Sequence, residues 1–273
     1  MKFPDNDEFF LLRKIPDVHR ARGFRLYLSN GKRLVDLWLN GGAAVLGHTP
    51  PDILRELKNT ASRGLYAPFP HFSQGRYINA LLKLLPGYSF RLYAAPPPPL
   101  ITLFEQGTAK LWRPFLDPKA PFSINENGEL FILVVPGIQI WRGELPLGLC
   151  VVAAKTEEFL SQLPPGDILP PVLLSVAARG VFDLLAALKR AKPSLPRTYK
   201  ILKNNETVWQ KQGIYLTLKE KPSLQEWEAL FFRFLEAGFL LPPVSVFPII
   251  LPGELSDGED AKLANALSVL NIC

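Results

Sequence analysis

Histidine and cysteine side chains are common sources of bases, nucleophiles and metal ligands, and this chain has few of them. It contains three histidines, His19, His48 and His71, and two cysteines, Cys150 and Cys273. No histidine has a cysteine, histidine or acidic residue at metal-ligand spacing, so we predict no metal site. Two cysteines also give no disulfide framework. His48 lies in a glycine-rich turn, where we predict a structural hydrogen bond rather than catalysis.

The stretch at residues 130–155, LFILVVPGIQIWRGELPLGLCVVAAK, has the pattern of an active-site floor in an α/β protein. Two apolar runs flank a turn that contains Gly and Pro, yet the stretch offers no convincing nucleophile or base. The chain also has no GxGxxG, GxxxxGK[ST] or GxSxG motif, which argues against dinucleotide, P-loop and hydrolase sites. Its carboxylates are scattered, and we can place no pair on one face for acid–base work.

The composition is that of an ordinary globular protein, with 48% hydrophobic and 21% charged residues among 273 and a net charge of +6. Basic residues concentrate at 189–203, KRAKPSLPRTYKILK, a pattern that favours a solvated helix end followed by a loop over a nucleic-acid site. The N-terminal MKFPDNDEFF lacks the apolar region of a signal peptide, and no stretch has the length of a membrane span. We expect a cytoplasmic protein without a membrane partner, and nucleic acid is only a weakly supported partner.

Proline divides the chain into short elements, because each of the 27 prolines fixes φ and removes a backbone donor. The run Pro96–Pro99 predicts a stiff loop after a strand; a polyproline ligand is the alternative. Without N–H groups, this loop cannot form the backbone cup that a phosphate needs.

The elements that must position any site alternate in type. Residues 24–38 predict a hairpin around Asn30-Gly31, and Thr49 is a candidate N-cap for the helix that follows. After a short helix at 100–105 we predict loop up to residue 128. The other expected helices span 51–63, 73–85, 172–190, 223–238 and a last one from Ser256, and the expected strands span 90–95, 130–135, 145–154, 213–219, 239–242 and 246–251. Interleaved strands and helices predict an α/β fold with an α+β C-terminal lobe.

In this order, several segments resemble class III aminotransferases of the fold type I pyridoxal-phosphate family, with glutamate-1-semialdehyde aminomutase the nearest. The likeness begins with a hairpin that ends in Asp36, a glycine-rich turn at residues 40–42 and Gly47-His48 before a helix. It continues at residues 145–148, LPLG, which resemble the strand after the catalytic lysine. The segments 170–185, 235–243 and 255–270 resemble later parts of the family.

The resemblance implies an α/β fold with a reduced core sheet like that of fold type I pyridoxal-phosphate transferases and an α+β C-terminal small domain. It divides the chain into an N-terminal hairpin and helix segment, 1–68, a reduced core domain, 69–190, and the small domain, 191–273. Residues 96–138 stand where the family builds most of a seven-stranded sheet, so we expect several units of that sheet to be missing.

The departures from the family concern its chemistry. Pyridoxal phosphate needs a Schiff-base lysine, an acid on the pyridine nitrogen and a phosphate cup. The resemblance places Gln139 near the position of the lysine, and the chain has no lysine between Lys119 and Lys155. It has no aspartate between Asp117 and Asp167. The cup falls either on the proline run or, in a competing alignment, on residues 106–109, QGTA.

We therefore expect no catalytic, cofactor-binding or metal-binding residue, although pyridoxal phosphate is the cofactor of the ancestral family. Our leading hypothesis is an inactive homologue that acts as a structural or regulatory scaffold, as a homodimer or paired with a related aminotransferase. A second hypothesis is a divergent aminotransferase or aminomutase that uses a displaced lysine, Lys110, Lys119 or Lys155. A third is an interaction module that binds protein or nucleic acid.

Overall fold

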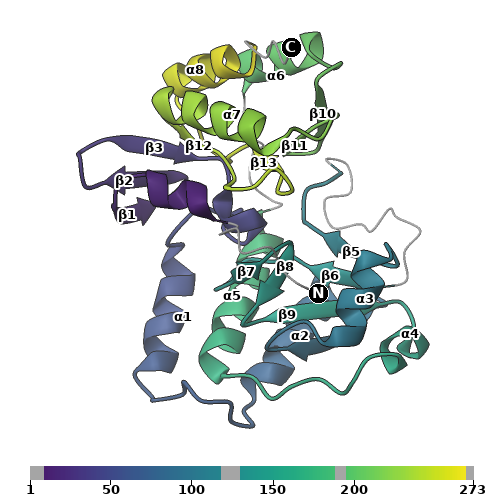
Figure 1. Ribbon diagram of the computed structural model, residues 1–273. Coiled ribbons are helices and arrows are strands. Elements are labelled where there is room, and N and C mark those ends of the chain that lie inside the picture. The colour runs from purple at the N-terminus through teal and green to yellow at the C-terminus, as the bar shows by residue number, and fades with distance from the viewer. Residues whose placement is uncertain (1–8, 118–129, 188–194, 269–273) are drawn as a thin grey trace. The chain divides into compact units, whose positions relative to one another are not determined.

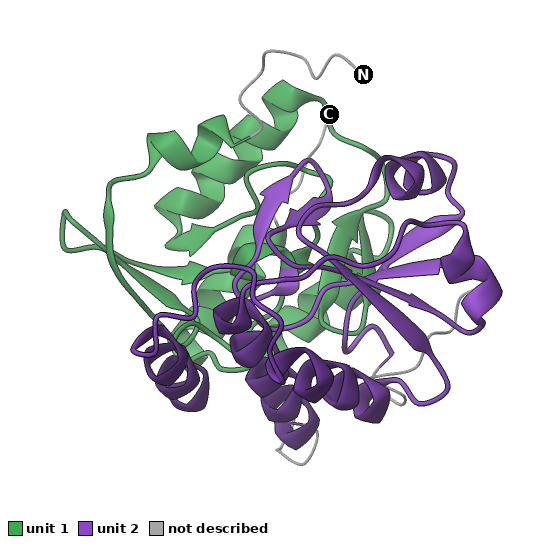
Figure 2. Cartoon of the chain, turned by 90° about the horizontal axis from the view of Figure 1, so that it is seen from below, with its two compact units in different colours: residues 1–41, 47–49, 191–273 green, residues 42–46, 50–190 purple. Residues whose placement is uncertain are grey.

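The computed structural model describes residues 9–117, 130–187 and 195–268, and these residues form two compact units. Unit 1 comprises residues 1–41, 47–49 and 191–273, and unit 2 comprises residues 42–46 and 50–190 (Figures 1 and 2). Each unit is therefore built from separate stretches of the chain. The division into three segments drawn from the sequence stays a prediction.

The first sheet of unit 1 grows from the predicted hairpin. Strands β1 (Val18–Arg22), β2 (Arg25–Leu28) and β3 (Arg33–Asp36) form an antiparallel meander, and β12 (Phe239–Leu240) pairs parallel with β3. Gly31, in the turn between β2 and β3, has φ of 79°, as the Asn30-Gly31 signal predicts. The hairpin prediction is confirmed.

The remainder of unit 1 is a second small sheet with helices. Strands β10 (Trp209–Gln212), β11 (Tyr215–Leu218) and β13 (Ile249–Ile250) pair antiparallel in that order. The helices are η1 (Phe10–Lys14), η2 (Leu39–Gly42, whose last residue belongs to unit 2), α6 (Pro196–Asn204), α7 (Leu224–Glu236) and α8 (Asp257–Ser268). One apolar core joins these elements and includes Leu11, Leu37, Leu216, Phe231 and Leu263.

Unit 2 is built around a four-stranded sheet in the order β4-β9-β6-β5. Its strands are β4 (Ser89–Tyr93), β5 (Ala109–Trp112), β6 (Leu130–Leu133) and β9 (Cys150–Ala154). Both β6 and β9 are buried along their whole length, as expected for strands covered on both faces. A separate hairpin of β7 (Ile140–Arg142) and β8 (Leu145–Leu147) precedes β9.

The helices of unit 2 are α1 (Pro51–Ala61), α2 (Ser73–Leu84), α3 (Pro98–Glu105), α4 (Glu157–Ser161) and α5 (Pro171–Ala187). Helix α5 packs against both α1 and α2. Leu100 of α3 and Leu160 of α4 share one apolar cluster with Ile132 and Val152 of the sheet, so α3 and α4 cover the same face.

Four local expectations are wrong. Residues 109–112, expected to be loop, form β5. The predicted strand 145–154 is divided into β8 and β9 at Gly148, which has φ of 79°. The N-cap of α1 is Pro50 rather than Thr49, which has φ of 52°. The proline run 96–99 is only partly loop, because Pro98 and Pro99 begin α3.

The basic segment 189–203 also differs from expectation. Residues 188–194 lie outside the described part of the chain, but the following residues form α6 instead of a loop. The N-cap position, Leu195, has no side chain able to cap this helix. Buried Asp260 of α8 does so instead, because its carboxylate accepts the N–H groups of Arg197 and Thr198, both at 3.1 Å.

Both predicted capping boxes are present in unit 1. Ser223 and Glu226 exchange hydrogen bonds at the start of α7, and Ser256 and Glu259 do so at the start of α8. Glu259 also receives two hydrogen bonds from the guanidinium of Arg25 in β2, at 2.9 and 2.5 Å. This bidentate pair ties α8 to the first sheet of unit 1.

The Glu259 pair predicts a pH-dependent stability. Burial opposes ionisation of Glu259, but hydrogen bonds from Arg25 and Ser256 outweigh burial and lower its pKa from 4.5 to about 2. A carboxyl whose pKa is lower in the folded chain stabilises the fold above its unfolded pKa, and this contribution is lost as the pH falls toward 2. We expect Glu259→Gln to lower the free energy of unfolding at neutral pH by about 1–2 kcal/mol.

Urea unfolding across the acidic range measures this effect. Glu259→Gln should flatten the loss of stability below the unfolded pKa, whereas the control Glu206→Gln, at an exposed position, should leave it unchanged. If Glu259→Gln follows the pH dependence of the wild type, the proposed role of the Arg25–Glu259 pair is wrong.

Candidate functional site

Strands β4, β5 and β6 run in the same direction, because β5 pairs parallel with β6 and both β4 and β6 pair antiparallel with β9. Their carboxyl ends therefore meet at one edge of the unit 2 sheet. In open α/β sheets, ligands bind outside this edge. The segments that leave it are residues 94–97 after β4, 113–117 after β5 and 134–139 after β6.

The N-terminus of α3 follows β4, at the first of the two positions that the resemblance gives to a phosphate cup. Helix N-termini bind phosphate through free N–H groups in the first turn. Here Pro98 and Pro99 have no N–H group, and those of Leu100 and Ile101 both donate to the carbonyl oxygen of Pro97, at 2.9 and 3.2 Å. This helix start therefore has no backbone donor to offer a phosphate.

The next backbone N–H group at the same edge already donates to a carboxylate of the protein itself. The N–H of Ala94 donates to Oδ2 of Asp167 at 2.8 Å, and the N–H of Asp167 donates to the carbonyl oxygen of Leu92 at 2.8 Å. A negative side chain at this position would repel a phosphate. No local motif in the sequence points to this contact, because Asp167 is 73 residues from Ala94.

The competing position for a phosphate cup, residues 106–109, is the C-terminal end of α3. The N–H groups of Gln106, Gly107 and Thr108 donate to the carbonyl oxygens of Thr102, Phe104 and Leu103, at 2.9–3.0 Å. These donors close the helix, and a helix C-terminus carries partial negative charge. The described residues at both positions do not fit a phosphate.

Gln139 is buried in the segment that follows β6. This segment packs tightly on α5, because a methyl group at Gly180 would overlap the carbonyl oxygen of Pro136. Gly137 faces Ala177 in the same helix, and a Cβ added to Gly137 would lie 3.7 Å from the Cβ of Ala177. The close approach holds residues 136–139 against α5, where a glycine is required at position 180.

The end of β6 is apolar. Leu133 and Val134 are fully buried, and Val135 is 1% exposed. Gly42 has φ of 112°, and an added Cβ there would lie 3.2 Å from Cγ1 of Val134. The chain at the end of β6 therefore contributes apolar side chains from residues 133–135.

Cys150 lies at the start of β9, the end of that strand at this edge. It is fully buried, and burial raises its pKa from 9.0 to about 12. The thiol stays protonated at neutral pH and is a poor nucleophile. Tyr77 of α2 is also fully buried, and burial raises the pKa of its hydroxyl.

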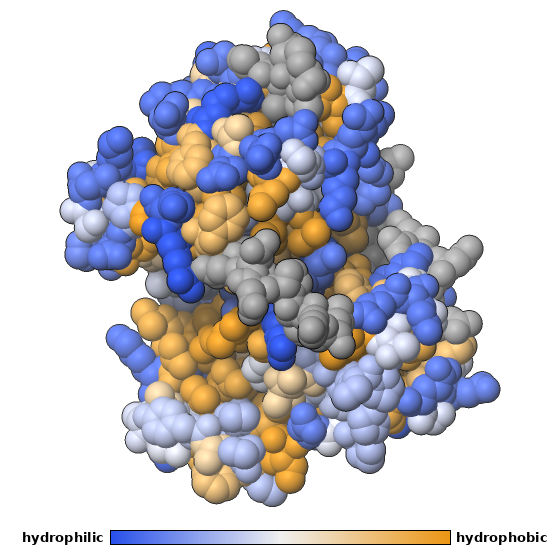
Figure 3. Space-filling model, viewed as in Figure 1, coloured by the Kyte–Doolittle hydropathy of each residue, from blue (hydrophilic) through white to orange (hydrophobic). Residues whose placement is uncertain are grey.

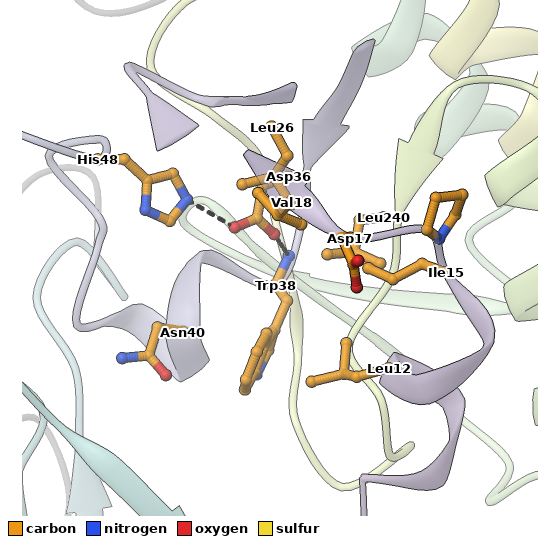
Figure 4. A pocket seen from close by; sticks show the side chains of 11 residues that line it. Leu12, Ile15, Asp17, Val18, Leu26, Asp36, Trp38, Asn40, His48 and Leu240 are labelled. Carbon is orange, nitrogen blue, oxygen red and sulfur yellow. Dashed lines mark hydrogen bonds and ion pairs between the residues drawn. The ribbon is translucent and has the colours of Figure 1, made fainter. Parts of the chain in front are cut away.

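Of the other segments singled out from the sequence, the turn after β3 in unit 1 has the most definite geometry. Oδ1 of buried Asp36 accepts the N–H groups of Trp38 and Leu39, at 2.8 and 3.0 Å, and Oδ2 lies 2.8 Å from Nε2 of His48 (Figure 4). The backbone of His48 also pairs with that of Gly23. The structural hydrogen bond predicted for His48 is present.

Metal and membrane sites can be tested only in the described ranges. Within residues 9–117, 130–187 and 195–268, no group of three or more His, Cys, Asp and Glu side chains is placed to hold a metal ion. Over the same ranges, every helix is too short or too polar to cross a membrane.

Comparison with other sequences finds two proteins of uncharacterized function. One, from Treponema pallidum (strain Nichols), is 27% identical over 293 residues, which cover 89% of this chain and 91% of that protein. The other, from Borreliella burgdorferi, is 44% identical over 69 residues, which cover 25% of this chain and 26% of that protein. No protein-family model matches the chain.

Comparison with solved structures identifies the fold. An ornithine aminotransferase from Plasmodium yoelii aligns over 97% of this chain and 94% of its own, with a TM-score of 0.65 and 14% identity. An omega-transaminase from Sphaerobacter thermophilus aligns over 96% and 95%, with a TM-score of 0.62 and 12% identity. An acetylornithine aminotransferase from Elizabethkingia anophelis aligns over 97% and 98%, with a TM-score of 0.60 and 14% identity. The predicted α/β fold of the pyridoxal-phosphate aminotransferases is confirmed.

Two glycine substitutions, one at the tight contact between α5 and residues 136–139 and one away from it, should have opposite effects on stability. We expect Gly180→Ala to lower the free energy of unfolding by about 2 kcal/mol or more, because the new methyl must displace the backbone at Pro136. Gly75→Ala in α2 meets nothing within 4 Å and should raise it by up to about 1 kcal/mol. Thermal unfolding of both variants tests the contact; similar stabilities would contradict it.

Proposed function

We propose that this chain is a catalytically inactive protein with the aminotransferase fold, which acts as a structural or regulatory scaffold by associating with a second copy or with a related aminotransferase. The observation that carries the proposal is the N-terminus of α3, which has no N–H group free for a phosphate. A fold that binds its cofactor through phosphate needs those donors.

The positions of the lysines also support the proposal that the chain is inactive. Pyridoxal chemistry requires a lysine whose amine is close to the aldehyde and partly desolvated. Residues 120–154 contain no lysine, and Gln139 stands near the position that the resemblance assigns to it. Lys155 follows β9 and is exposed to solvent, whereas Lys110 lies within β5; Lys119 lies outside the described residues.

The aspartate that the resemblance places on the pyridine nitrogen has no counterpart in residues 118–166. Residues 118–166 contain no aspartate, and the residues at the end of β6 are apolar and buried. A neutral pyridine ring withdraws electrons less strongly than a protonated one, so the loss of the acid would remove much of the cofactor's chemical use. The departures in the lysine, the aspartate and the phosphate cup, at the positions that the resemblance gives them, together support the proposal.

A role in association is favoured by the surface of unit 2. The connection between α1 and α2 exposes three aromatic side chains, Tyr66, Phe69 and Phe72, which are 63%, 50% and 69% exposed. In Figure 3, hydrophobic residues reach the surface among hydrophilic ones at the lower end of the view, where Figure 1 draws this connection. Exposed aromatic side chains on a segment stiffened by Pro68 and Pro70 are typical of protein interfaces.

The cofactor prediction is tested with the purified chain and added pyridoxal phosphate. We expect no saturable absorbance band of an aldehyde bound to lysine, and no stoichiometric label after borohydride reduction. A reducible band at one mole per chain, mapped by peptide analysis to Lys110, Lys119 or Lys155, would instead support an enzyme with a displaced lysine. Transaminase activity that is lost on changing a residue near Gln139 would also overturn the proposal.

The association prediction is tested by sedimentation equilibrium. We expect the wild-type chain to self-associate, and Phe69→Ser with Phe72→Ser to raise the dissociation constant at least about tenfold, because both side chains would leave a buried interface. Leu224→Ser in unit 1, where the side chain is 56% exposed, serves as the control and should leave association unchanged.

Two outcomes would count against self-association through this segment. A wild-type chain that stays monomeric at tens of micromolar leaves only pairing with a related aminotransferase, to be tested by mixing the two proteins. Equal dissociation constants for the wild type and the double variant would place the interface elsewhere. Binding to nucleic acid that weakens steeply with salt would favour an interaction module instead.

A further inference from the structure

Unit 1 contains a pocket whose lining residues all belong to that unit. It has a volume of about 340 Å³ and lies between the segment from η1 to β1 and the turn that follows β3 (Figure 4). Pockets that hold small molecules have volumes of roughly 300–1,000 Å³. The space therefore suits one small ligand.

The wall of this pocket is mainly apolar. Leu12 and Ile15 line it from the segment before β1, and Leu240 lines it from β12. Trp38 contributes an indole ring from the turn after β3. An apolar ligand body would be removed from water here, and an aromatic ring also attracts cations.

Two carboxylates, those of Asp36 and Asp17, line the pocket. Asp36 is 2% exposed and lies within the pocket, and Asp17 lines it at the surface. No lysine or arginine is among its lining residues. His48 also lines the pocket, and its Nε2 lies 2.8 Å from Oδ2 of Asp36, so the carboxylates of the lining outnumber the groups that can carry a positive charge.

The backbone that forms one side of the pocket is strained. Leu39 and Asn40 have φ of 46° and 50°, in the left-handed region that residues other than glycine seldom adopt. Such conformations cost about 1–3 kcal/mol each and concentrate at functional sites. The hydrogen bonds from Trp38 and Leu39 to Asp36 hold this turn, so the strain and the buried charge belong to the same site.

We propose that this pocket binds a small organic ammonium ion with an apolar body. The ammonium group would lie near Asp36 and Asp17, and the apolar body would contact Leu12, Ile15 and Trp38. A carboxylate or phosphate of the same size would be repelled by both aspartates. The proposal does not depend on whether the chain binds pyridoxal phosphate.

Calorimetric titration of the full chain tests this selectivity with three probes of equal length, namely n-hexylammonium, n-hexanol and n-hexanoate, at neutral pH and low ionic strength. We expect saturable binding of hexylammonium, binding of hexanol at least about tenfold weaker, and no saturable binding of hexanoate. Added salt should weaken the binding of hexylammonium, because the attraction to Asp17 at the surface is screened. Equal affinity for hexylammonium and hexanoate, or no saturable binding of hexylammonium, would overturn the proposal.

Substitutions of the two aspartates test whether hexylammonium binds in this pocket. Asp36→Asn removes the buried charge but also disturbs the turn, so Asp17→Asn, at a position nearer the surface, provides a variant that should fold. We expect Asp17→Asn to weaken the binding of hexylammonium at least about fivefold, whereas Glu220→Gln, which removes an exposed charge elsewhere in unit 1, should change it less than twofold. Unchanged binding by Asp17→Asn would overturn the assignment.

Discussion

The buried carboxylate of Asp36 is the interaction on which the N-terminal part of the structure depends. A charge removed from water costs several kcal/mol unless polar partners replace the solvent. Asp36 has three such partners, the N–H groups of Trp38 and Leu39 and the ring of His48. Together they end β3, hold the left-handed turn and join it to the chain just before α1. Because the carboxylate is buried, the loss of any one of these partners would leave it without a hydrogen bond that water cannot replace. The partners come from two segments, so the carboxylate also holds these segments together.

The free N–H groups at the helix N-termini of this chain find their acceptors in different ways. Helix α3, at the position that the resemblance gives to a phosphate, differs from α6 and α7. Helix α7 is capped by its own Ser223, and α6 is capped by Asp260 from a distant helix. Both arrangements use an oxygen atom to accept free N–H groups. Helix α3 instead begins with two prolines, which have no N–H group, and the next two N–H groups donate to the carbonyl oxygen of Pro97. A ligand anion would find no free N–H group in the first turn of α3, and the proposed inactivity rests on this observation.

Much of the fold could be predicted from local patterns in the sequence, and the failures share a physical cause. Asn30-Gly31, the Ser223–Glu226 capping box and the apolar run of β6 act within a few residues, so their structures were predicted correctly. Strand β5, AKLW, is too short for its alternation to be seen and forms because β6 offers it a partner. Helix α6 has no N-cap of its own, since its cap lies 63 residues away in sequence. Of the candidate site, the role of His48 could be inferred, but the contact of Asp167 with Ala94 is purely tertiary.

The composition of unit 1 from two ends of the chain has a consequence for its synthesis. Strand β3 is completed by β12, with Val35 opposite Phe239. At translation rates of about 5–20 residues per second, the roughly 200 residues between them take on the order of 10–40 s to emerge. During this time β3 is an unpaired edge of the meander, and by the end of it all of unit 2 has emerged from the ribosome. The nascent chain therefore completes its middle first, and its beginning becomes a finished sheet only when its end arrives.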